Sequence, residues 1–454
     1  MYVPVWRLRR PAITETLGTG SGRGTRSVAG FDEDTTSMGV EAARTALRNA
    51  PDGAEPTTVW FATTAPAYLD KTNANTIHAA LALPSSAGAY DCIGSTRSGS
   101  AAVMGAYFRG GLAVLSDTRT GLPGGADESN GGDDVIAEPI GGSSVTAEFL
   151  DRWRAPGEQS SKQWEERFGE HAYAPLVEQA VDDAVKSAGI TVGDVDHVIV
   201  TGLHTRAVNA AKKSIGAGGD ALVDDLTGVI GQTGTAHWAL LLCDVLDRAE
   251  PGQTIMTVHL ADGCDVWVLR TTDAIATRRP PRTVRAGIEA GRNDLAYPDF
   301  LTWKGHLRRE PPRRPEPERT ASPPSLRSSA WKYGLFGSRD EDGFVHLPPS
   351  RVSMRGGAID RMEMVRMADV RGTVATFTVD RLAFSLSPPV VSAVIDFDGG
   401  GRFQCELTDA DHTSVRIGDR VEMTFRRLST QDGIHNYFWK ARPASADAPK
   451  EIED

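Results

Sequence analysis

A proline- and arginine-rich segment divides this chain into two parts. Residues His306 to Ser329, HLRREPPRRPEPERTASPPSLRSS, contain almost no apolar side chains. Segments of this composition stay extended and cannot pack into a core, so they typically serve as spacers between domains. We therefore expect a first domain over residues 1–305, an extended linker over 306–330, a second domain over 331–446 and a disordered tail over 447–454.

The first part alternates strand and helix patterns. Short apolar runs typical of buried strands occur at Thr57 to Thr64, Ala87 to Ile93, Leu112 to Asp117 and Val195 to Leu203. Helical patterns occur at Thr36 to Ala50, Tyr173 to Ala188 and Thr235 to Leu246, and Thr254 to Thr272 is expected to form two strands around a tight turn. This alternation predicts an α/β fold, and the similar order of elements near both ends indicates two similar halves.

The second part carries mostly strand patterns. They are Met362 to Asp380, Val390 to Asp396, Gly401 to Leu407, Arg420 to Arg426 and Asn436 to Lys440. Five or six short strands separated by glycine and aspartate turns predict a small closed β-barrel.

Charge and cysteine content narrow the class of protein. The chain has 60 acidic and 49 basic residues, a formal charge of -11 that disfavours nucleic acid as a partner. No apolar run reaches the roughly 18 residues of a membrane span, and the start is too polar for a secretory signal. The four cysteines lie far apart without a C-x-x-C pair. We expect a cytoplasmic protein without a membrane span, a disulfide framework or a cysteine metal site.

Five segments of the first part together carry a family resemblance. They are YDCIGSTRSGSAA from Tyr90, HTRAVNAAKK from His204, GQTGT from Gly231, ADGCD from Ala261 and YPDFLTWKG from Tyr297. In this order and spacing they resemble the thiolase superfamily, most closely its 3-hydroxy-3-methylglutaryl-CoA synthase branch. The resemblance implies a thiolase-like five-layer αβαβα domain made of two similar halves. It also implies an acyl-CoA substrate or ligand and a homodimer.

The second part resembles another domain that accompanies these enzymes. The residues WKYG from Trp331 and FVHLPP from Phe344 are similar to the acyl-CoA-associated OB-fold domain, often a separate chain. That family usually carries a zinc ribbon before the barrel, built from two cysteine pairs. Here the corresponding stretch offers Asp340, Asp342, Ser353 and Gly356 instead. We therefore expect no structural zinc, no other metal and no covalently bound cofactor.

The resemblance places the family's nucleophile on a residue of different chemistry. Aligned on Asp91 and Gly99, the catalytic cysteine falls on Thr96. A threonine hydroxyl needs an adjacent base before it can attack a thioester, so we favour a second interpretation in which Ser95, Thr96 and Ser98 cap the following helix. Cys92 and Cys264 lie nearby in the pattern but are expected to behave as buried, unreactive thiols.

Two polar residues remain as candidates for polarising a carbonyl group. His204 ends an apolar strand and opens a helix, where the family places an active-site histidine, although a lone histidine can equally be structural. Gln232 takes the place of the family's second oxyanion-hole amide and could donate a hydrogen bond from a longer side chain. The family's general-base glutamate has no counterpart in the stretch Thr63 to Tyr68.

A basic cluster follows His204 on the same predicted helix. Arg206, Lys212 and Lys213 match the region where the synthases contact the phosphates of CoA. Cations on an otherwise acidic protein can hold such an anion, but the same pattern also fits a solvated helix face.

Two functions from different classes fit these residues. The first is an acyl-CoA-processing enzyme that forms or cleaves a carbon–carbon bond without an acyl-enzyme, in the manner of an aldolase. The second is a non-catalytic acyl-CoA-binding scaffold that docks a separate thiolase through its OB-fold domain.

Overall fold

The first domain is built on two β-sheets. The computed structural model describes residues 1–19, 22–50, 55–119, 121–123, 138–277, 279–310 and 314–444. The smaller of the two sheets is parallel, with the strand order β4-β3-β5. Its strands are β3 (Thr58–Thr63), β4 (Gly88–Ile93) and β5 (Leu112–Leu115). The second sheet has the order β6-β11-β10-β9, with β6 (Glu138–Thr146), β9 (His197–Gly202), β10 (Thr254–Leu260) and β11 (Gly263–Arg270).

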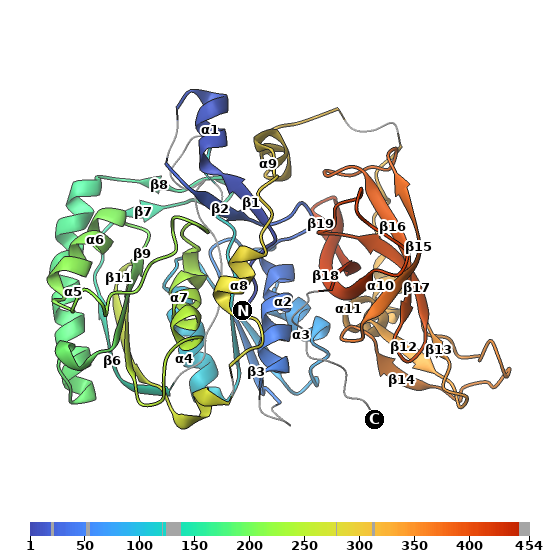
Figure 1. Ribbon diagram of the computed structural model, residues 1–454, viewed down its shortest axis with the longest axis horizontal. Coiled ribbons are helices and arrows are strands. Elements are labelled where there is room, and N and C mark those ends of the chain that lie inside the picture. Colours follow the sequence, from blue (N-terminus) through green and yellow to red (C-terminus); the bar gives the residue numbers. More distant parts are fainter. Residues whose placement is uncertain are drawn as a thin grey trace.

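Helices lie between these sheets and on both outer faces (Figure 1). The helices α4 (Ser98–Arg109) and α7 (His237–Leu246) pack in the middle, where Ala102, Leu115 and Leu240 belong to one buried cluster. The outer layers are α2 (Thr35–Arg48) with α3 (Ala74–Ala80), and α5 (Glu166–Ala188) with α6 (Thr205–Ser214). This order of five layers agrees with the expected αβαβα architecture. The helix expected from Tyr173 begins earlier, and Pro175 lies inside it.

Shorter elements complete this domain. They are β1 (Trp6–Arg9) paired with β2 (Thr25–Val28), β7 (Arg152–Trp153) paired with β8 (Lys162–Gln163), the helices α1 (Arg10–Leu17), α8 (Val284–Glu289) and α9 (Tyr297–Trp303), and the 3-10 turns η2 (Val192–Asp194), η3 (Gly234–Ala236) and η4 (Asp273–Ala276). Among the described helices, none is both long and apolar enough to cross a bilayer.

The linker is only partly extended. Residues 314–321 contain no helix or strand, but α10 (Ser322–Arg327) and α11 (Ser329–Gly334) follow. The expectation of an extended segment up to residue 330 was therefore wrong at its C-terminal end. The prolines of α10 occupy its first turn, where a missing N–H costs no hydrogen bond.

The second part folds into the predicted closed barrel. Its strands are β15 (Gly372–Asp380), β16 (Val390–Phe397), β17 (Arg402–Leu407), β18 (Arg420–Gln431) and β19 (Ile434–Pro443), in the order β15-β16-β17-β19-β18. A small sheet precedes it, formed by β12 (Phe336–Arg339), β13 (Val345–His346) and β14 (Glu363–Arg366). The tail expected over 447–454 lies outside the described residues.

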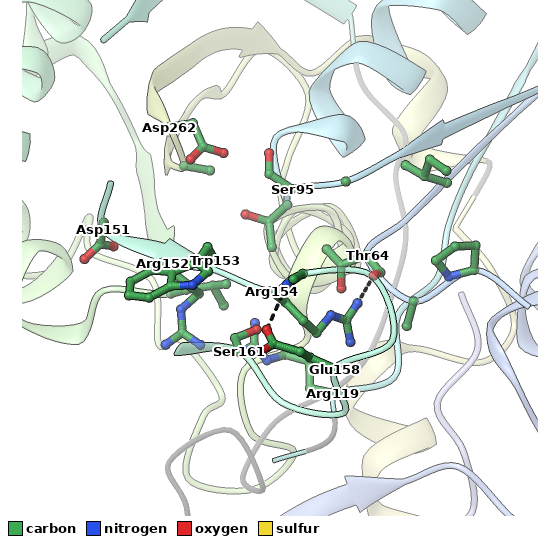
Figure 2. Close-up of a pocket in the computed structure, with 18 of the residues that line it drawn as sticks. Thr64, Ser95, Arg119, Asp151, Arg152, Trp153, Arg154, Glu158, Ser161 and Asp262 are labelled. Carbon is green, nitrogen blue, oxygen red and sulfur yellow. Dashed lines mark hydrogen bonds between the residues drawn. The ribbon is translucent and has the colours of Figure 1, made fainter. Parts of the chain in front are cut away.

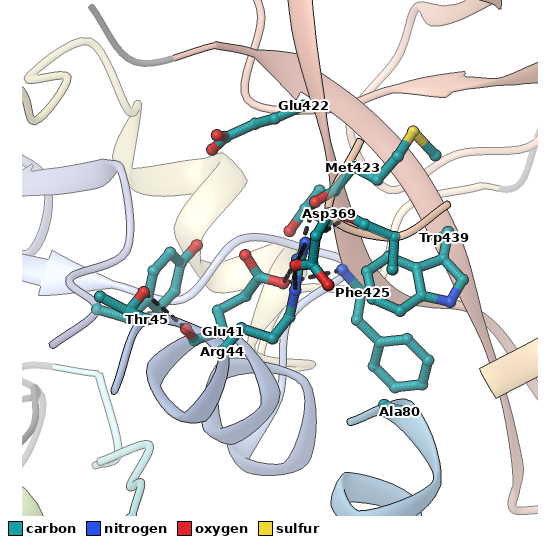
Figure 3. Close-up of polar contacts among 12 residues, drawn as sticks. Glu41, Arg44, Thr45, Ala80, Asp369, Glu422, Met423, Phe425 and Trp439 are labelled. Carbon is teal, nitrogen blue, oxygen red and sulfur yellow. Dashed lines mark hydrogen bonds and ion pairs between the residues drawn. The ribbon is translucent and has the colours of Figure 1, made fainter. Parts of the chain in front are cut away.

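The two domains share one core and a buried polar contact. Val40 and Phe61 of the first domain belong to the same buried cluster as Ile395 and Trp439 of the barrel. Arg44 of α2 points into the barrel side of the contact (Figure 3), where its guanidinium donates to the carbonyl oxygens of Ala368 and Met423, at 2.6 and 2.9 Å. The barrel is thus packed directly on α2.

Candidate functional site

A pocket of about 540 Å³ opens where four strands of the two sheets end. Its lining includes Thr64 after β3, Ile93 at the end of β4, Leu203 after β9 and Leu260 at the end of β10. These are all C-terminal ends, which is where ligands bind in open α/β sheets. Residues 151–158 and Ser161, around β7 and β8, form another wall (Figure 2). The pocket therefore lies between the two halves of the first domain.

Thr96 lines this pocket two residues before α4. Thr96 is only 4% exposed. The helix begins at Ser98, Arg97 is its N-cap residue, and no side chain accepts a hydrogen bond there. Ser95 Oγ instead accepts from the backbone N–H of Arg97 at 3.2 Å. Our prediction that these hydroxyl groups cap α4 was therefore wrong, and Thr96 remains a pocket residue without that structural role.

Arg97 fixes the segment that carries Thr96. Its guanidinium forms an ion pair with Asp265 of β11 at 2.8 Å and donates to the carbonyl oxygen of Asp262 at 2.7 Å. The pair is largely buried, so water screens it weakly. Asp262 also lines the pocket and has a φ of 48°, a left-handed conformation that is uncommon for a residue other than glycine.

His204 lies behind the pocket wall. Its Nδ1 accepts a hydrogen bond from the backbone N–H of Ala207 at 3.0 Å, which caps α6 and leaves the proton of the neutral ring on Nε2. That Nε2 atom is 3.9 Å from Asp151 Oδ1, and the ring is 5.9 Å from the ring of Tyr173. Asp151 and Tyr173 line the pocket, whereas His204, only 1% exposed, does not.

Gln232 is held within the protein by both ends of its amide. Nε2 donates to Thr201 Oγ1 at 3.1 Å and to the carbonyl oxygen of Gly202 at 3.3 Å, while Oε1 accepts from the backbone N–H of Gly234 at 2.7 Å. Gln232 does not line the pocket. The structure thus brings Thr96 to the cavity but places His204 and Gln232 outside its wall. Their catalytic roles stay predictions.

The predicted CoA-binding cluster lies on α6. Arg206 and Lys213 are exposed, and Lys212 is half-buried with its Nζ 2.7 Å from Asp225 Oδ2. Burial opposes the charge of Asp225, but hydrogen bonds from Lys212 and Thr227 lower its pKa to about 2. None of the three cations lines the pocket. Phosphate binding by this cluster stays a prediction.

Sequence reasoning missed the charged groups that do line the pocket. Figure 2 shows Asp151, Arg119, Arg152, Arg154 and Glu158 around the cavity. They come from loops and from the short strand β7, where neither helical nor strand periodicity marks a residue. The charge run in DRWR was the available signal, but a charge run by itself usually indicates a solvated surface.

Asp151 is a carboxylic acid of the pocket whose pKa is shifted from its ordinary value. Its side chain is 10% exposed, and Oδ1 has no hydrogen-bond partner among the described residues. Burial raises the pKa of Asp151, and the nearby His204 opposes this only in part. A carboxyl group whose pKa is raised inside a pocket is a candidate for proton exchange with a bound ligand.

The cysteines offer no nucleophile to this pocket, since none of the four lines it. Cys264 is buried, which raises the pKa of its thiol to about 12, and burial also raises the pKa of Cys92. Both thiols are therefore protonated at neutral pH, and a protonated thiol is a poor nucleophile.

Hydrogen bonds to the carboxylate of Asp340 hold the small sheet before the barrel together. Asp340 Oδ1 accepts from the backbone N–H groups of Asp342 and Phe344, and Oδ2 accepts from Ser353 Oγ at 2.6 Å. The Nε2 atom of His346 lies 3.3 Å from the same carboxylate. Among the described residues, no group of three or more metal-ligating side chains could hold a metal ion.

Comparison with known proteins identifies the family. Residues 364–426 match the family model described as the C-terminal OB-fold domain of ChsH2. The hydroxymethylglutaryl-CoA synthase of Methanothermobacter thermautotrophicus is 28% identical over 336 residues, which cover 68% of this chain and 97% of that protein. The same enzyme of Aeropyrum pernix is 30% identical over 307 residues, which cover 62% of this chain and 85% of the relative. The chain belongs to the hydroxymethylglutaryl-CoA synthase family.

A solved structure gives the same fold for this synthase-family chain. MvaS in complex with 3-hydroxy-3-methylglutaryl coenzyme A matches with a TM-score of 0.51 and 16% identity, over 80% of this chain and 97% of MvaS. The predicted fold, a thiolase-like domain followed by an OB-fold barrel, is confirmed.

Proposed function

We propose that this chain binds an acyl-CoA thioester in the pocket and forms or cleaves a carbon–carbon bond without an acyl-enzyme. The observation that carries the proposal is Thr96, which lines the pocket at the start of α4 while no cysteine does. Membership in a family named for CoA thioester chemistry supports the ligand class. A threonine without an adjacent base forms an acyl-enzyme far less readily than a cysteine.

The pocket also supplies groups for chemistry without a covalent intermediate. Aldol-type steps need a base for the proton beside a carbonyl and a donor for the resulting oxyanion. Asp151 is the base we propose, with His204 directly behind it. Arg152 and Arg154, on the same segment as Asp151, and Arg119, after β5, offer cationic donors. His204 and Gln232 as carbonyl donors, and the α6 cations as phosphate contacts, remain part of this proposal.

We also propose that the chain forms a homodimer through β4 and α4. Within the described residues, β4 is an edge strand of its sheet, so one side of its backbone is open to pairing. Tyr90 of β4 and Met104, Tyr107 and Phe108 of α4 are between 43% and 74% exposed. An open edge beside exposed aromatic side chains is typical of an interface, and two identical edges pair around a two-fold axis.

A scaffold is the second candidate function. The connection between β13 and β14 exposes Val352, Met354 and Ile359, which are 45%, 84% and 64% exposed. Val352 and Ile359 are bridged partners, so these two apolar side chains lie close together. Exposed apolar side chains of this kind favour docking of a separate thiolase, which would receive an acyl-CoA held by this chain.

One experiment separates these functions. The purified chain is incubated with acetyl-CoA and acetoacetyl-CoA, and intact protein mass, free CoA and acyl products are measured. We expect turnover without a protein adduct, and loss of turnover in Asp151→Asn and His204→Ala but not in His171→Ala, an exposed histidine on α5. A stable acyl adduct on the wild-type chain would overturn the non-covalent mechanism. Binding without turnover would favour the scaffold.

A further inference from the structure

One wall of the pocket is an irregular segment that reaches the barrel. We call residues Thr64 to Leu69 the rim segment. It follows β3 and contains no helix or strand, and Thr64, Ala65, Pro66 and Leu69 line the pocket. The position of this segment therefore affects the shape of the cavity.

The two ends of the rim segment are held by the first domain itself. The backbone N–H and the hydroxyl group of Thr64 both donate to Asp117 Oδ1, at 3.1 and 2.8 Å. At the other end, Asn73 exchanges two hydrogen bonds with the backbone of Tyr68, at 3.0 and 2.9 Å. These contacts fix the backbone where the segment starts and finishes, but they leave the side chain of Tyr68 and the backbone of Ala67 to other partners.

Ala67 and Tyr68 of the rim segment contact the hairpin of β18 and β19. Tyr68 Oη accepts a hydrogen bond from the backbone N–H of His435 at 2.7 Å, and the two rings lie 5.1 Å apart. The ring of His435 also hydrogen-bonds to the backbone of Ala67, and its Nδ1 lies 2.8 Å from Thr430 Oγ1 across the hairpin. His435 thus joins both strands of the hairpin to the rim segment.

The hairpin is itself fixed to the start of α2. The hydroxyl group of Tyr437 donates to Asp34 Oδ2 at 2.7 Å, and the next residue, Thr35, donates from Oγ1 to the carbonyl oxygen of Ala65 at 2.9 Å. Figure 1 shows β18 and β19 on the side of the barrel that faces α2. The hairpin, the start of α2 and the rim segment therefore form one hydrogen-bonded unit that ends at the pocket.

We propose that the β18–β19 hairpin of the barrel positions the rim segment and thereby sets the shape of the acyl-CoA pocket. Tyr68 and His435 are positioning residues, because neither needs to touch a ligand. The barrel domain is then a part of the binding site of the other domain. The ligand part of this inference rests on the proposed function, whereas the positioning part does not.

Hydrogen exchange of the full chain, followed by mass spectrometry, tests the positioning. In His435→Ala we expect peptides that contain residues 64–70 to exchange at least several-fold faster, with α5 and α6 unchanged. Ile434→Ala, a change at the adjacent residue, which is 46% exposed, is the matched control and is expected to leave the rim unaffected. Tyr68→Phe removes only the accepting hydroxyl group and covers the case in which His435→Ala misfolds. Unchanged exchange of the rim in both variants would overturn the proposal.

Calorimetric titration with acetyl-CoA tests the effect on the pocket. We expect affinity to fall several-fold in His435→Ala and Tyr68→Phe and to stay unchanged in Ile434→Ala. If hydrogen exchange of the rim segment is faster in these variants but their affinity for acetyl-CoA is unchanged, the claim that the hairpin shapes the pocket is overturned. If the wild-type chain binds no acetyl-CoA, the proposed function fails, while the exchange result still decides whether the hairpin positions the rim.

Discussion

In the proposed mechanism, Thr96 decides which chemistry the pocket can perform, because it lines the cavity two residues before α4. A thiol at a helix N-terminus has a lowered pKa, since the partial positive charge there stabilises the thiolate. We therefore expect Thr96→Cys to acquire an acetyl group from acetyl-CoA, seen as an adduct in intact-mass spectra. Ser161→Cys places a thiol elsewhere on the same pocket and should remain unmodified. Binding of acetyl-CoA without any adduct on Thr96→Cys would contradict a thiolase-type site.

The ionisation of Asp151 predicts how the stability of the protein depends on pH. Because burial raises the pKa of Asp151, the folded state holds its proton more tightly than the unfolded chain does. Its contribution to stability is therefore present at acidic pH and lost as the pH rises through the raised value. Asp151→Asn stays neutral, so we expect it to unfold at a higher temperature than the wild type at pH 8. The difference should vanish below pH 3.8, the ordinary value for this group. Asp220→Asn, an exposed residue, is the control for thermal unfolding.

Asp340 decides the stability of the small sheet formed by β12, β13 and β14. Hydrogen bonds from Ser353 and from the backbone of Phe344 lower the pKa of this carboxyl group. Its contribution to stability is thus present above the ordinary value of 3.8 and is lost as the pH falls through the lowered one. We expect Asp340→Ala to speed hydrogen exchange of this sheet at pH 7, while a chelator added to the wild type changes nothing. Loss of the sheet on chelation would show that a metal holds it.

The proposed dimer interface is formed by two elements, β4 and α4. Charges introduced into an apolar interface lose their hydration without gaining partners. Tyr107→Asp combined with Phe108→Asp should therefore turn a dimer into a monomer of 48.6 kDa, measured by light scattering after size exclusion. Leu326→Asp, at a residue of α10 that is 77% exposed, should leave the assembly unchanged. A wild-type chain that is monomeric at micromolar concentration would contradict the proposal.

Across the whole molecule, Arg44 couples the two domains. Its guanidinium lies 2.8 Å from Glu41 of the same helix, 3.1 Å from Asp369 of the second domain and 4.8 Å from the ring of Trp439 in the barrel (Figure 3). Burial alone would raise the pKa of Glu41, but Arg44 and Arg442 outweigh it and lower the pKa to about 2. Removal of one partner from a buried ion pair typically costs about 3 to 5 kcal/mol.

We therefore expect Arg44→Ala to separate one unfolding transition into two, seen by calorimetry, because the barrel loses its attachment to α2. Arg9→Ala breaks an exposed pair with Glu15 and should cost about 0.5 kcal/mol or less. A single transition in Arg44→Ala at unchanged temperature would show that the shared apolar core alone couples the domains.

Much of the fold could be predicted from local patterns. The strands around Val59, Val198 and Val258 are continuous apolar runs because both faces of each sheet are covered. The barrel strands could be recognised because turn residues separate them. Boundaries that depend on contacts were less predictable. The prolines of α10 suggested an extended chain, although a helix accepts proline in its first turn.

The candidate site was less predictable than the fold. Thr96 was found because a family motif surrounds it. Asp151 was missed because it lies in an irregular segment, and only burial against His204 and Tyr173 gives it an unusual environment. Gln232 was selected by position, but the distances to Thr201 and Gly234 show that its amide is already engaged.

The sequence alone determined the two-domain order and the α/β and barrel classes, and it predicted a hydroxyl group at Thr96 where the family resemblance places a thiol. Periodicity and residue identity are local properties, so they can be read along the chain. Only the tertiary structure decided that Asp151 enters the pocket, that His204 lies behind it, and that His435 reaches the rim segment from the barrel. These arrangements join residues far apart in the sequence, and their physical origin is packing, which no single segment encodes.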